Sequence, residues 1–157
     1  MEKQPAPLFK GVTDTGEKIS LEQFRGKWVI LYFYPRDNTP GCTAEALDFR
    51  NAAEDFAKHN AVILGVSPDP INRHQKFKQK YQLPFVLISD EDHSIAEQYG
   101  VWKEKKLYGK VFPGIERSTF IIDPDGNIVA AFRKVKVKGH VQTVLETLQQ
   151  LQQQTQN

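Results

Sequence analysis

The longest unbroken apolar run in the chain, Trp28 to Tyr34, is followed by a short polar loop and then by apolar residues at helical spacing. The run does not alternate with polar residues, which is typical of a strand buried on both faces of a sheet. Pro35 ends the run, and threonine followed by proline, at Thr39 and Pro40, is a favoured start for a helix. The helix that follows is predicted to continue to Lys58, with an apolar face formed by Ala46, Phe49, Ala53 and Phe56.

The remaining apolar runs alternate with more polar, helix-forming segments. Buried strands are predicted at 61–66 and 85–88, and helices at 21–24, 69–81, 92–100 and 141–151. Short strands at 9–12 and 17–19, and at 118–122 and 127–132, flank turn sequences and predict two hairpins. Glycine and proline predict an irregular loop at 101–115, and the alternation of charge with valine predicts a strand at 133–138. This order predicts an α/β fold, in which helices flank a mixed central sheet with an N-terminal hairpin extension.

Length and composition limit the class of protein. A chain of 157 residues predicts a single domain over 1–157, with 1–8 as an extended arm and 152–157 as a frayed tail. Apolar and charged fractions of 39% and 25% are those of a globular protein. A net charge of +2 is too small to indicate binding to nucleic acid or to an acidic membrane. One cysteine, no apolar leader and no membrane-length apolar run favour the cytoplasm and exclude an intrachain disulfide.

Cys42, the only cysteine, falls in the first turn of the helix predicted to start at Thr39. Backbone N–H groups there lack intrahelical partners and the helix dipole is positive, so a thiolate is stabilised. The dipole supplies only about 0.3–1 kcal/mol, so full activation requires a second positive group. Free cysteines also commonly pack as small buried apolar residues. The residues alone therefore leave a reactive and a purely structural interpretation of Cys42 open.

Pro35, Thr39 and Cys42 form the pattern P-x-x-x-T-x-x-C directly after an apolar strand. This pattern resembles the peroxidatic motif of the peroxiredoxins. The longer strings YFYPRDNTPGCTAEA and RSTFIIDPDG resemble the bacterioferritin comigratory protein (peroxiredoxin Q) subfamily, and the resemblance covers about Pro5 to Leu151. It implies a thioredoxin-like fold without cofactor or metal. It also implies that hydrogen peroxide and organic hydroperoxides are reduced through a Cys42 sulfenic acid, in antioxidant defence and redox homeostasis.

The resemblance also implies roles for five further residues. Arg117 matches the family arginine that lies near the thiol, and would be the second positive group. Thr39 is expected to cap the helix, or to donate to the thiolate and orient the peroxide. Pro35 and Gly41 are expected to shape the pocket, and Glu45 to hold the arginine.

Leu47 is where the chain departs from many relatives, which carry a second, resolving cysteine at this position. The resemblance therefore implies a single-cysteine enzyme that is reduced by an external thiol: a thioredoxin, a glutaredoxin or glutathione. The helical wheel predicts that Leu47 lies on the solvent side, either as a single exposed leucine or as part of a partner-binding patch. We expect a monomer or a weak homodimer.

Two other classes of function are weighed against this one. A thiol hydrolase needs a histidine base beside its cysteine. The four histidines, at 59, 74, 93 and 140, show no metal-ligand spacing and are predicted to lie on the surface. A non-catalytic thioredoxin-fold binding module or holdase would not need Cys42. Ester turnover without peroxide consumption would favour the hydrolase, and client protection without Cys42 would favour the holdase.

Overall fold

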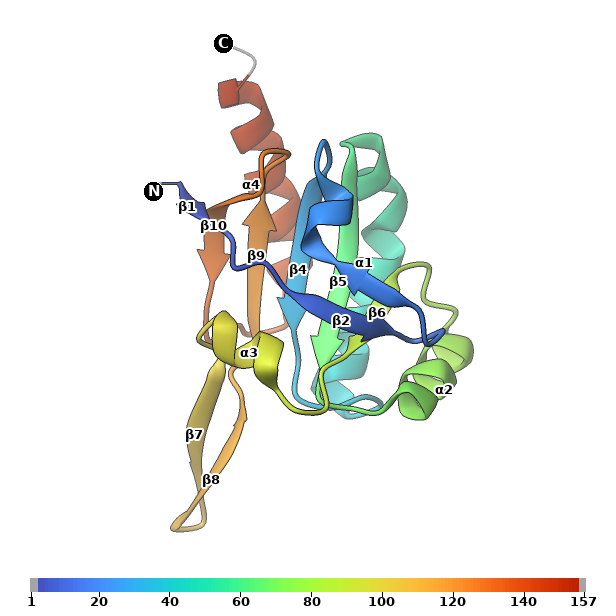
Figure 1. Ribbon diagram of the computed structural model, residues 1–157, viewed down its shortest axis with the longest axis vertical. Helices are drawn as coiled ribbons and strands as arrows, with labels where there is room; N and C mark the ends of the chain where they lie inside the picture. Colours follow the sequence, from blue (N-terminus) through green and yellow to red (C-terminus); the bar gives the residue numbers. More distant parts are fainter. Residues whose placement is uncertain (1–2, 156–157) are drawn as a thin grey trace.

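A computed structural model describes residues 3–155, in which helices lie on both faces of a central sheet (Figure 1). The sheet has eight strands in the order β1 (Gln4–Pro5), β10 (Asn127–Phe132), β9 (Ser118–Ile122), β4 (Trp28–Phe33), β5 (Ala61–Ser67), β6 (Val86–Ser89), β2 (Lys10–Thr13) and β3 (Lys18–Ser20). The helices are η1 (Leu21–Phe24), α1 (Pro40–Lys58), α2 (Ile71–Tyr81), α3 (Ser94–Gln98) and α4 (His140–Thr155). The predicted mixed sheet and its N-terminal hairpin, β2–β3, are confirmed.

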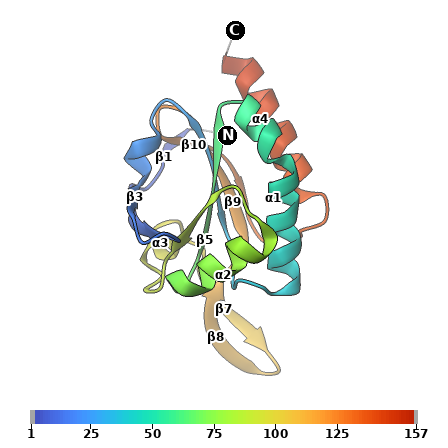
Figure 2. The same ribbon diagram turned by 90° about the vertical axis from the view of Figure 1, so that its right-hand side faces the viewer.

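Strand β4 separates the two hydrophobic cores. It pairs in parallel with β5 and antiparallel with β9, and all six of its residues are buried, as the sequence predicts. Ile30 and Tyr32 pack into the core that α1, α2 and α4 cover, whereas Leu31 and Phe33 pack into the core that η1 and α3 cover. Figure 2 shows this division, with α1 and α4 on one side of the sheet and α3 on the other. A strand buried on both faces is a rigid support for whatever follows it.

The connection from β4 to α1 places Cys42 at one end of the sheet. Helix α1 begins at Pro40 with Thr39 as its N-cap residue, as predicted. Asn60 adopts a left-handed conformation just past the end of this helix, with φ of 58°. The chain then returns as β5, parallel to β4. Cys42 therefore lies beyond the carboxyl end of the central strand, in the first turn of α1, where backbone N–H groups have no intrahelical partner.

The segment 101–115 is a β-hairpin, so the prediction of an irregular loop is wrong. Strands β7 (Trp102–Leu107) and β8 (Lys110–Ile115) pair antiparallel around Tyr108 and Gly109. Both turn residues have positive φ, 52° and 75°, as a two-residue type I′ turn requires. Because both strands of a two-stranded ribbon are edges, Pro113 is tolerated within β8. The hairpin projects from the end of the molecule at which α1 begins (Figure 1).

Two other predicted segments differ from the structure. Arg133–Lys138 is a loop rather than a strand, because Lys134 adopts φ of 50° and breaks the extended backbone. Helix α4 continues to Thr155, so 152–155 is not a frayed tail. The Gln152 side chain donates to the carbonyl oxygen of His59 at 2.6 Å and fixes this last turn against the end of α1. Residues 1–2 of the predicted arm and 156–157 of the predicted tail lie outside the described residues.

Within residues 3–155, no helix combines the length and the hydropathy that crossing a bilayer requires.

Candidate active site

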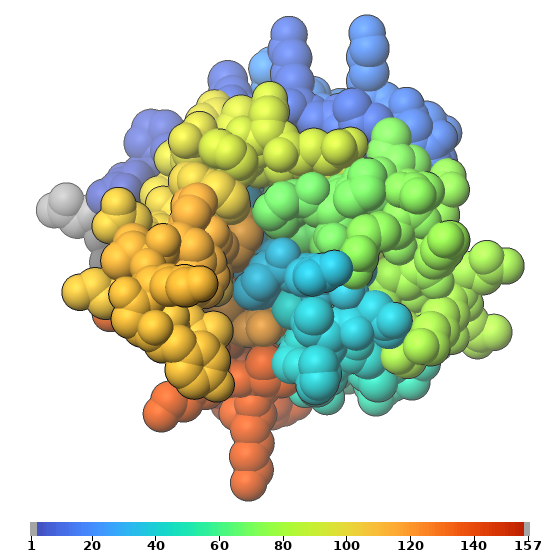
Figure 3. Space-filling model, turned by 90° about the horizontal axis from the view of Figure 1, so that it is seen from below, coloured from blue at the N-terminus to red at the C-terminus, as the bar shows by residue number. Residues whose placement is uncertain are grey.

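Cys42 lies in the first turn of α1 and is buried, with 2% of its surface exposed. It belongs to the core beneath α1, together with Ala46 and Phe49 of the same helix. Figure 3 looks onto this end of the molecule and shows the start of α1, in cyan, beside the β7–β8 hairpin, in yellow and orange, with a hollow between them.

Arg117, in the connection between β8 and β9, supplies the positive group that the helix dipole alone cannot. Its Nη2 donates to Cys42 Sγ at 3.3 Å and its Nη1 to Glu45 Oε1 at 2.7 Å, so one planar fork joins the thiol to the carboxylate. The backbone carbonyl of Arg117 accepts a hydrogen bond from the N–H of Val135 at 3.0 Å, which anchors the arginine from the 133–138 loop. Burial lowers the pKa of Arg117, but the charges of Glu45 and Cys42 outweigh burial and raise it overall.

Gly41 permits this approach. A Cβ atom at this position would lie 3.3 Å from Arg117 Nη2, a closer contact than side chains normally make. The guanidinium would have to move by a few tenths of an ångström to relieve that contact. The glycine in the first turn of α1 therefore sets how closely Arg117 reaches the thiol.

Glu45 is fully buried one turn beyond Cys42. Burial raises its pKa to about 7, against the opposing effect of the positive charge on Arg117. Its second oxygen, Oε2, makes no hydrogen bond to another described residue, and neither does the hydroxyl of Tyr32. Burial, followed by the charge of Glu45, raises the pKa of Tyr32 well above its usual value, so this phenol stays neutral. Glu45 is thus the group near the thiol whose charge changes around neutral pH.

The Thr39 hydroxyl and the exposure of Leu47 both differ from the expectation. The Thr39 hydroxyl donates to the Arg36 carbonyl at 2.9 Å and makes no side-chain cap of α1, so the expected cap is absent. This bond orients the loop instead, and Pro35 lies half-buried at the start of that loop. Leu47 is half-buried rather than exposed, on an α1 that is continuous from Pro40 to Lys58.

A buried polar network, which the sequence did not predict, holds the same loop. Asp37 accepts from Tyr34 Oη at 2.5 Å, contacts His74 Nδ1 through Oδ2 at 2.6 Å, and donates its N–H to Asp69 at 2.7 Å. His74 Nε2 lies 3.0 Å from the carbonyl oxygen of Ile88. Both ring nitrogens of His74 thus face acceptor oxygens, one on Asp37 and one on Ile88. The network connects the loop between β4 and α1 to α2.

The prediction that the histidines lie on the surface is wrong for two of them. His74 and His140 are buried, with 0% and 7% exposed. His140 Nε2 contacts the Thr119 hydroxyl at 2.8 Å, and burial, followed by the positive charge of Arg117, lowers its pKa to about 4. Of the described residues, only Arg117 hydrogen-bonds the Cys42 thiol. The histidine base that a thiol hydrolase needs is thus not in contact with Cys42 in this part of the chain.

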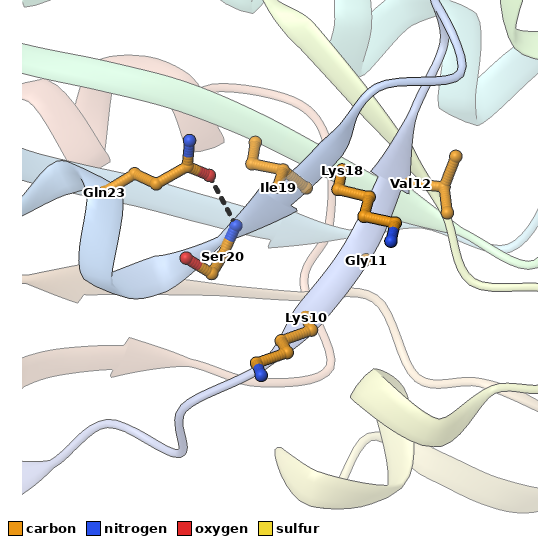
Figure 4. A pocket seen from close by; sticks show the side chains of 7 residues that line it. All are labelled: Lys10, Gly11, Val12, Lys18, Ile19, Ser20 and Gln23. Atoms are coloured by element: carbon orange, nitrogen blue, oxygen red, sulfur yellow. Dashed lines mark hydrogen bonds between the residues drawn. The ribbon is translucent and has the colours of Figure 1, made fainter.

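Two other places were candidates for binding. Asp37, Asp69 and His74 bring ligand-type atoms within 4.8 Å of one another. His74 Nδ1 already bonds Asp37 Oδ2, and Asp69 Oδ2 accepts from the backbone N–H of Asp37. Arg73 pairs with Asp69 Oδ1 at 3.1 Å, so positive charge is supplied by the protein itself. A surface hollow on the β2–β3 hairpin is shown in Figure 4. There the Gln23 side chain accepts from the N–H of Ser20 at 2.6 Å, a capping contact of η1, and no nucleophilic thiol lines the hollow.

Comparison with known proteins gives consistent results. The model of the AhpC/TSA family matches residues 3–131. Peroxiredoxin Bcp of Bacillus subtilis is 52% identical over 148 residues, which are 94% of this chain and 94% of that protein. A putative peroxiredoxin Bcp of Coxiella burnetii is 53% identical over 145 residues, 92% of this chain and 96% of that protein. The solved structure of the Xanthomonas campestris bacterioferritin comigratory protein superposes with a TM-score of 0.86 at 44% identity and covers 90% of each chain.

A mixed sheet flanked by helices, with a buried thiol at a helix N-terminus beside an arginine, defines a thioredoxin-fold thiol peroxidase. The chain belongs to the AhpC/TSA family and, within it, to the Bcp (peroxiredoxin Q) peroxiredoxins. The thioredoxin-like fold and the thiol-dependent peroxidase function predicted from the sequence are confirmed, and the single cysteine is consistent with a single-cysteine mechanism. The holdase, binding-module and hydrolase alternatives are not favoured.

Proposed function

We propose that Cys42 is the peroxidatic nucleophile and that Arg117 is its activating and peroxide-binding partner. The observation that carries this proposal is the 3.3 Å contact between Arg117 Nη2 and Cys42 Sγ in the first turn of α1. The helix N–H groups and the guanidinium both stabilise negative charge, on the thiolate before reaction and on the peroxide oxygens during it. Gly41 and Glu45 are positioning residues in this proposal, because each acts on Arg117.

The reaction that this arrangement supports is a nucleophilic displacement at oxygen. The Cys42 thiolate attacks the terminal peroxide oxygen, an S–O bond forms and the O–O bond breaks. The leaving oxygen takes up a proton and departs as water or an alcohol, and Cys42 is left as a sulfenic acid. Thr39 would orient the peroxide by turning its hydroxyl from the Arg36 carbonyl toward the hollow, and Pro35 would form part of the pocket wall.

Reduction has to come from outside the chain, since no second cysteine exists. A thioredoxin, a glutaredoxin or glutathione would supply the thiol. Hydrogen peroxide and organic hydroperoxides are the proposed substrates, and the solved Xanthomonas campestris relative is described for alkyl peroxide reduction. The proposed setting is antioxidant defence in the cytoplasm, as a monomer or weak homodimer.

Three variants test the proposed roles. Cys42→Ser removes the nucleophile at nearly constant volume and should reduce peroxide consumption by more than about 1,000-fold, with unchanged circular dichroism. Arg117→Ala should slow formation of the sulfenic acid, trapped with dimedone, by about 100- to 1,000-fold. Arg117→Lys keeps the charge without the fork and should fall between Arg117→Ala and the wild type. Substantial turnover by Cys42→Ser, or a wild-type rate in Arg117→Ala, would contradict the assignment.

A further inference from the structure

A reductant that attacks Cys42 must approach past the β7–β8 hairpin. The sulfur is buried, and the chain continues from β8 through Glu116 directly to Arg117, which contacts the sulfur. The hairpin therefore stands beside the route to the thiol, as the space-filling view also shows (Figure 3). Its strands of six residues extend about 20 Å along the chain.

The strand register divides the side chains of the hairpin between two faces. Directly opposed residues project to the same side, so Lys103, Lys105, Leu107, Lys110, Phe112 and Gly114 share one face, which we call the thiol-side face. Lys105 packs over Gly114, where a Cβ atom would lie 3.2 Å from its Cδ. Burial lowers the pKa of Lys105, whose side chain is half-buried. Cys42 belongs to the core covered by α1, α2 and α4, on one side of the sheet. The opposite face carries Ile115, which is buried in the core covered by η1 and α3.

The thiol-side face combines apolar and basic groups. Leu107 and Phe112 are 55% and 41% exposed, and Tyr108 at the tip is 94% exposed. The side chains of Lys103, Lys105 and Lys110 make no ion pair or hydrogen bond to any other residue in the range 3–155, and no acidic residue lies on this face. Exposed apolar side chains gathered on one projecting element mark an interaction site. The lysines around them select a partner with acidic groups.

We propose that the thiol-side face is the docking surface for the external reductant, and that this reductant is a protein dithiol whose cysteine lies in an apolar surface with acidic residues nearby. This inference rests on the proposed function. A protein surface contacts the tip and the hollow at once, whereas a tripeptide thiol in the hollow does not need Leu107 or Tyr108. The combination of a long apolar edge and unpaired lysines therefore favours a protein over glutathione.

The docked dithiol completes the cycle with a balanced exchange. Its first thiolate attacks the sulfur of the Cys42 sulfenic acid, an S–S bond forms, and the hydroxyl leaves as water with one proton. The second thiolate of the partner then attacks the sulfur of the partner's first cysteine in the mixed disulfide. This step returns Cys42 to the thiol and leaves the partner with an internal disulfide. Two electrons pass from the dithiol to Cys42, and no other reactant is needed.

The experiment separates oxidation from reduction. Wild type and variants are first oxidised with one equivalent of peroxide, and the sulfenic acid is quantified in a separate aliquot with dimedone by mass spectrometry. The oxidised proteins are then reduced either by a bacterial thioredoxin or by dithiothreitol, and the rate constant of each reaction is measured. The thiol-side variants are Leu107→Ser/Phe112→Ser and Lys110→Glu. The matched controls, Val111→Ser and Lys106→Glu, alter exposed residues on the opposite face of the same hairpin.

We expect the thiol-side variants to slow reduction by thioredoxin about tenfold or more, with the dithiothreitol rate within about twofold of wild type. The rate constant for reduction of the oxidised wild type by thioredoxin should fall as the salt concentration rises. Lys110→Glu should weaken this salt dependence. Equal thioredoxin rates in all variants, equal slowing with dithiothreitol, or efficient reduction by glutathione alone would overturn the docking proposal. Failure to form any sulfenic acid in the first step would instead overturn the proposed function.

Discussion

At the scale of single residues, the site depends on how closely one guanidinium approaches one sulfur. In the proposed site Gly41 permits that approach by having no side chain, since a Cβ atom would stand 3.3 Å from Arg117 Nη2. Its backbone is helical and does not require glycine conformationally. Alanine favours the helix over glycine by up to about 1 kcal/mol, so stability alone would favour alanine at this position.

Gly41→Ala is therefore expected to change stability and activity in opposite directions. The free energy of unfolding should stay constant or rise by up to about 1 kcal/mol, because alanine is the better helix former. Formation of the sulfenic acid should slow by roughly tenfold, because Arg117 is displaced from the thiol. Urea unfolding and single-turnover oxidation measure the two effects.

Ala44→Gly is the matched control for this variant. Ala44 is exposed near the start of α1 and should lose up to about 1 kcal/mol of stability as glycine without any change in the oxidation rate. If both variants leave the oxidation rate unchanged, Gly41 has no role in placing Arg117.

At the scale of elements, the loop before α1 is fixed from α2. His74 is completely buried and pairs with Asp37, 2% exposed, at 2.6 Å. The surrounding charged and titratable groups are Tyr34 just after β4, Asp69 after β5 and Arg73 on α2. Because the two side chains bond each other where both are buried, removing one leaves the other buried without its partner.

His74→Leu should destabilise the protein by about 3–5 kcal/mol, because it leaves Asp37 buried without its partner. The oxidation rate should fall as well, since the loop that carries Thr39 loses its anchor. The double variant Asp37→Asn/His74→Leu should cost clearly less than the sum of the two single variants. Urea unfolding of the four proteins measures the coupling, and strictly additive losses would show that the pair does not act as a unit.

The sequence predicted those elements whose signals are local. The unbroken apolar run of β4 and the Thr39–Pro40 start of α1 are such signals, and both are confirmed. The β7–β8 hairpin was missed because Gly109 and Pro113 were interpreted as strand breakers, although Tyr108–Gly109 is also a two-residue turn sequence. A single isolated ribbon tolerates proline where a larger sheet does not.

The sequence predicted the residues around the thiol but missed the buried network that holds the preceding loop. The motif indicated Cys42 and the family resemblance indicated Arg117 and Glu45, and the structure brings these three residues together. Asp37 and His74 were missed because their pairing joins positions 37 residues apart. One local signal exists, since His74 lies three residues before Phe77 and shares its buried helix face. A polar residue on such a face is a candidate for a buried network.

At the scale of the whole molecule, stability responds to pH through two buried groups near the site. The pKa of Glu45 is about 7 in the folded state, against 4.5 for an ordinary glutamate. Its contribution to stability is therefore complete below pH 4.5 and is lost as the pH rises through 7. His140 acts in the opposite sense, because its pKa is lowered from 6.5 to about 4 and its contribution is lost as the pH falls through that range.

Glu45→Gln isolates the first effect, since glutamine is always neutral. Relative to this variant, wild type should lose about 3 kcal/mol of unfolding free energy between pH 4.5 and 7, the equivalent of 2.5 pKa units. Urea unfolding at intervals of pH measures the difference, and His140 cancels because both proteins contain it. Parallel stability curves would mean that the ion pair with Arg117, at 2.7 Å, outweighs burial.

A chain with one thiol stores one oxidation event at a time. No internal disulfide holds the signal in a protected form, so each molecule is either reset by an encounter or lost to further oxidation. In a steady state, the oxidised fraction is the rate of peroxide arrival divided by the sum of the rates of arrival and resetting. Alkylation of free thiols followed by mass spectrometry would measure that fraction. The fraction would report the balance between oxidation by peroxide and reduction by the external thiol, rather than the concentration of either reactant.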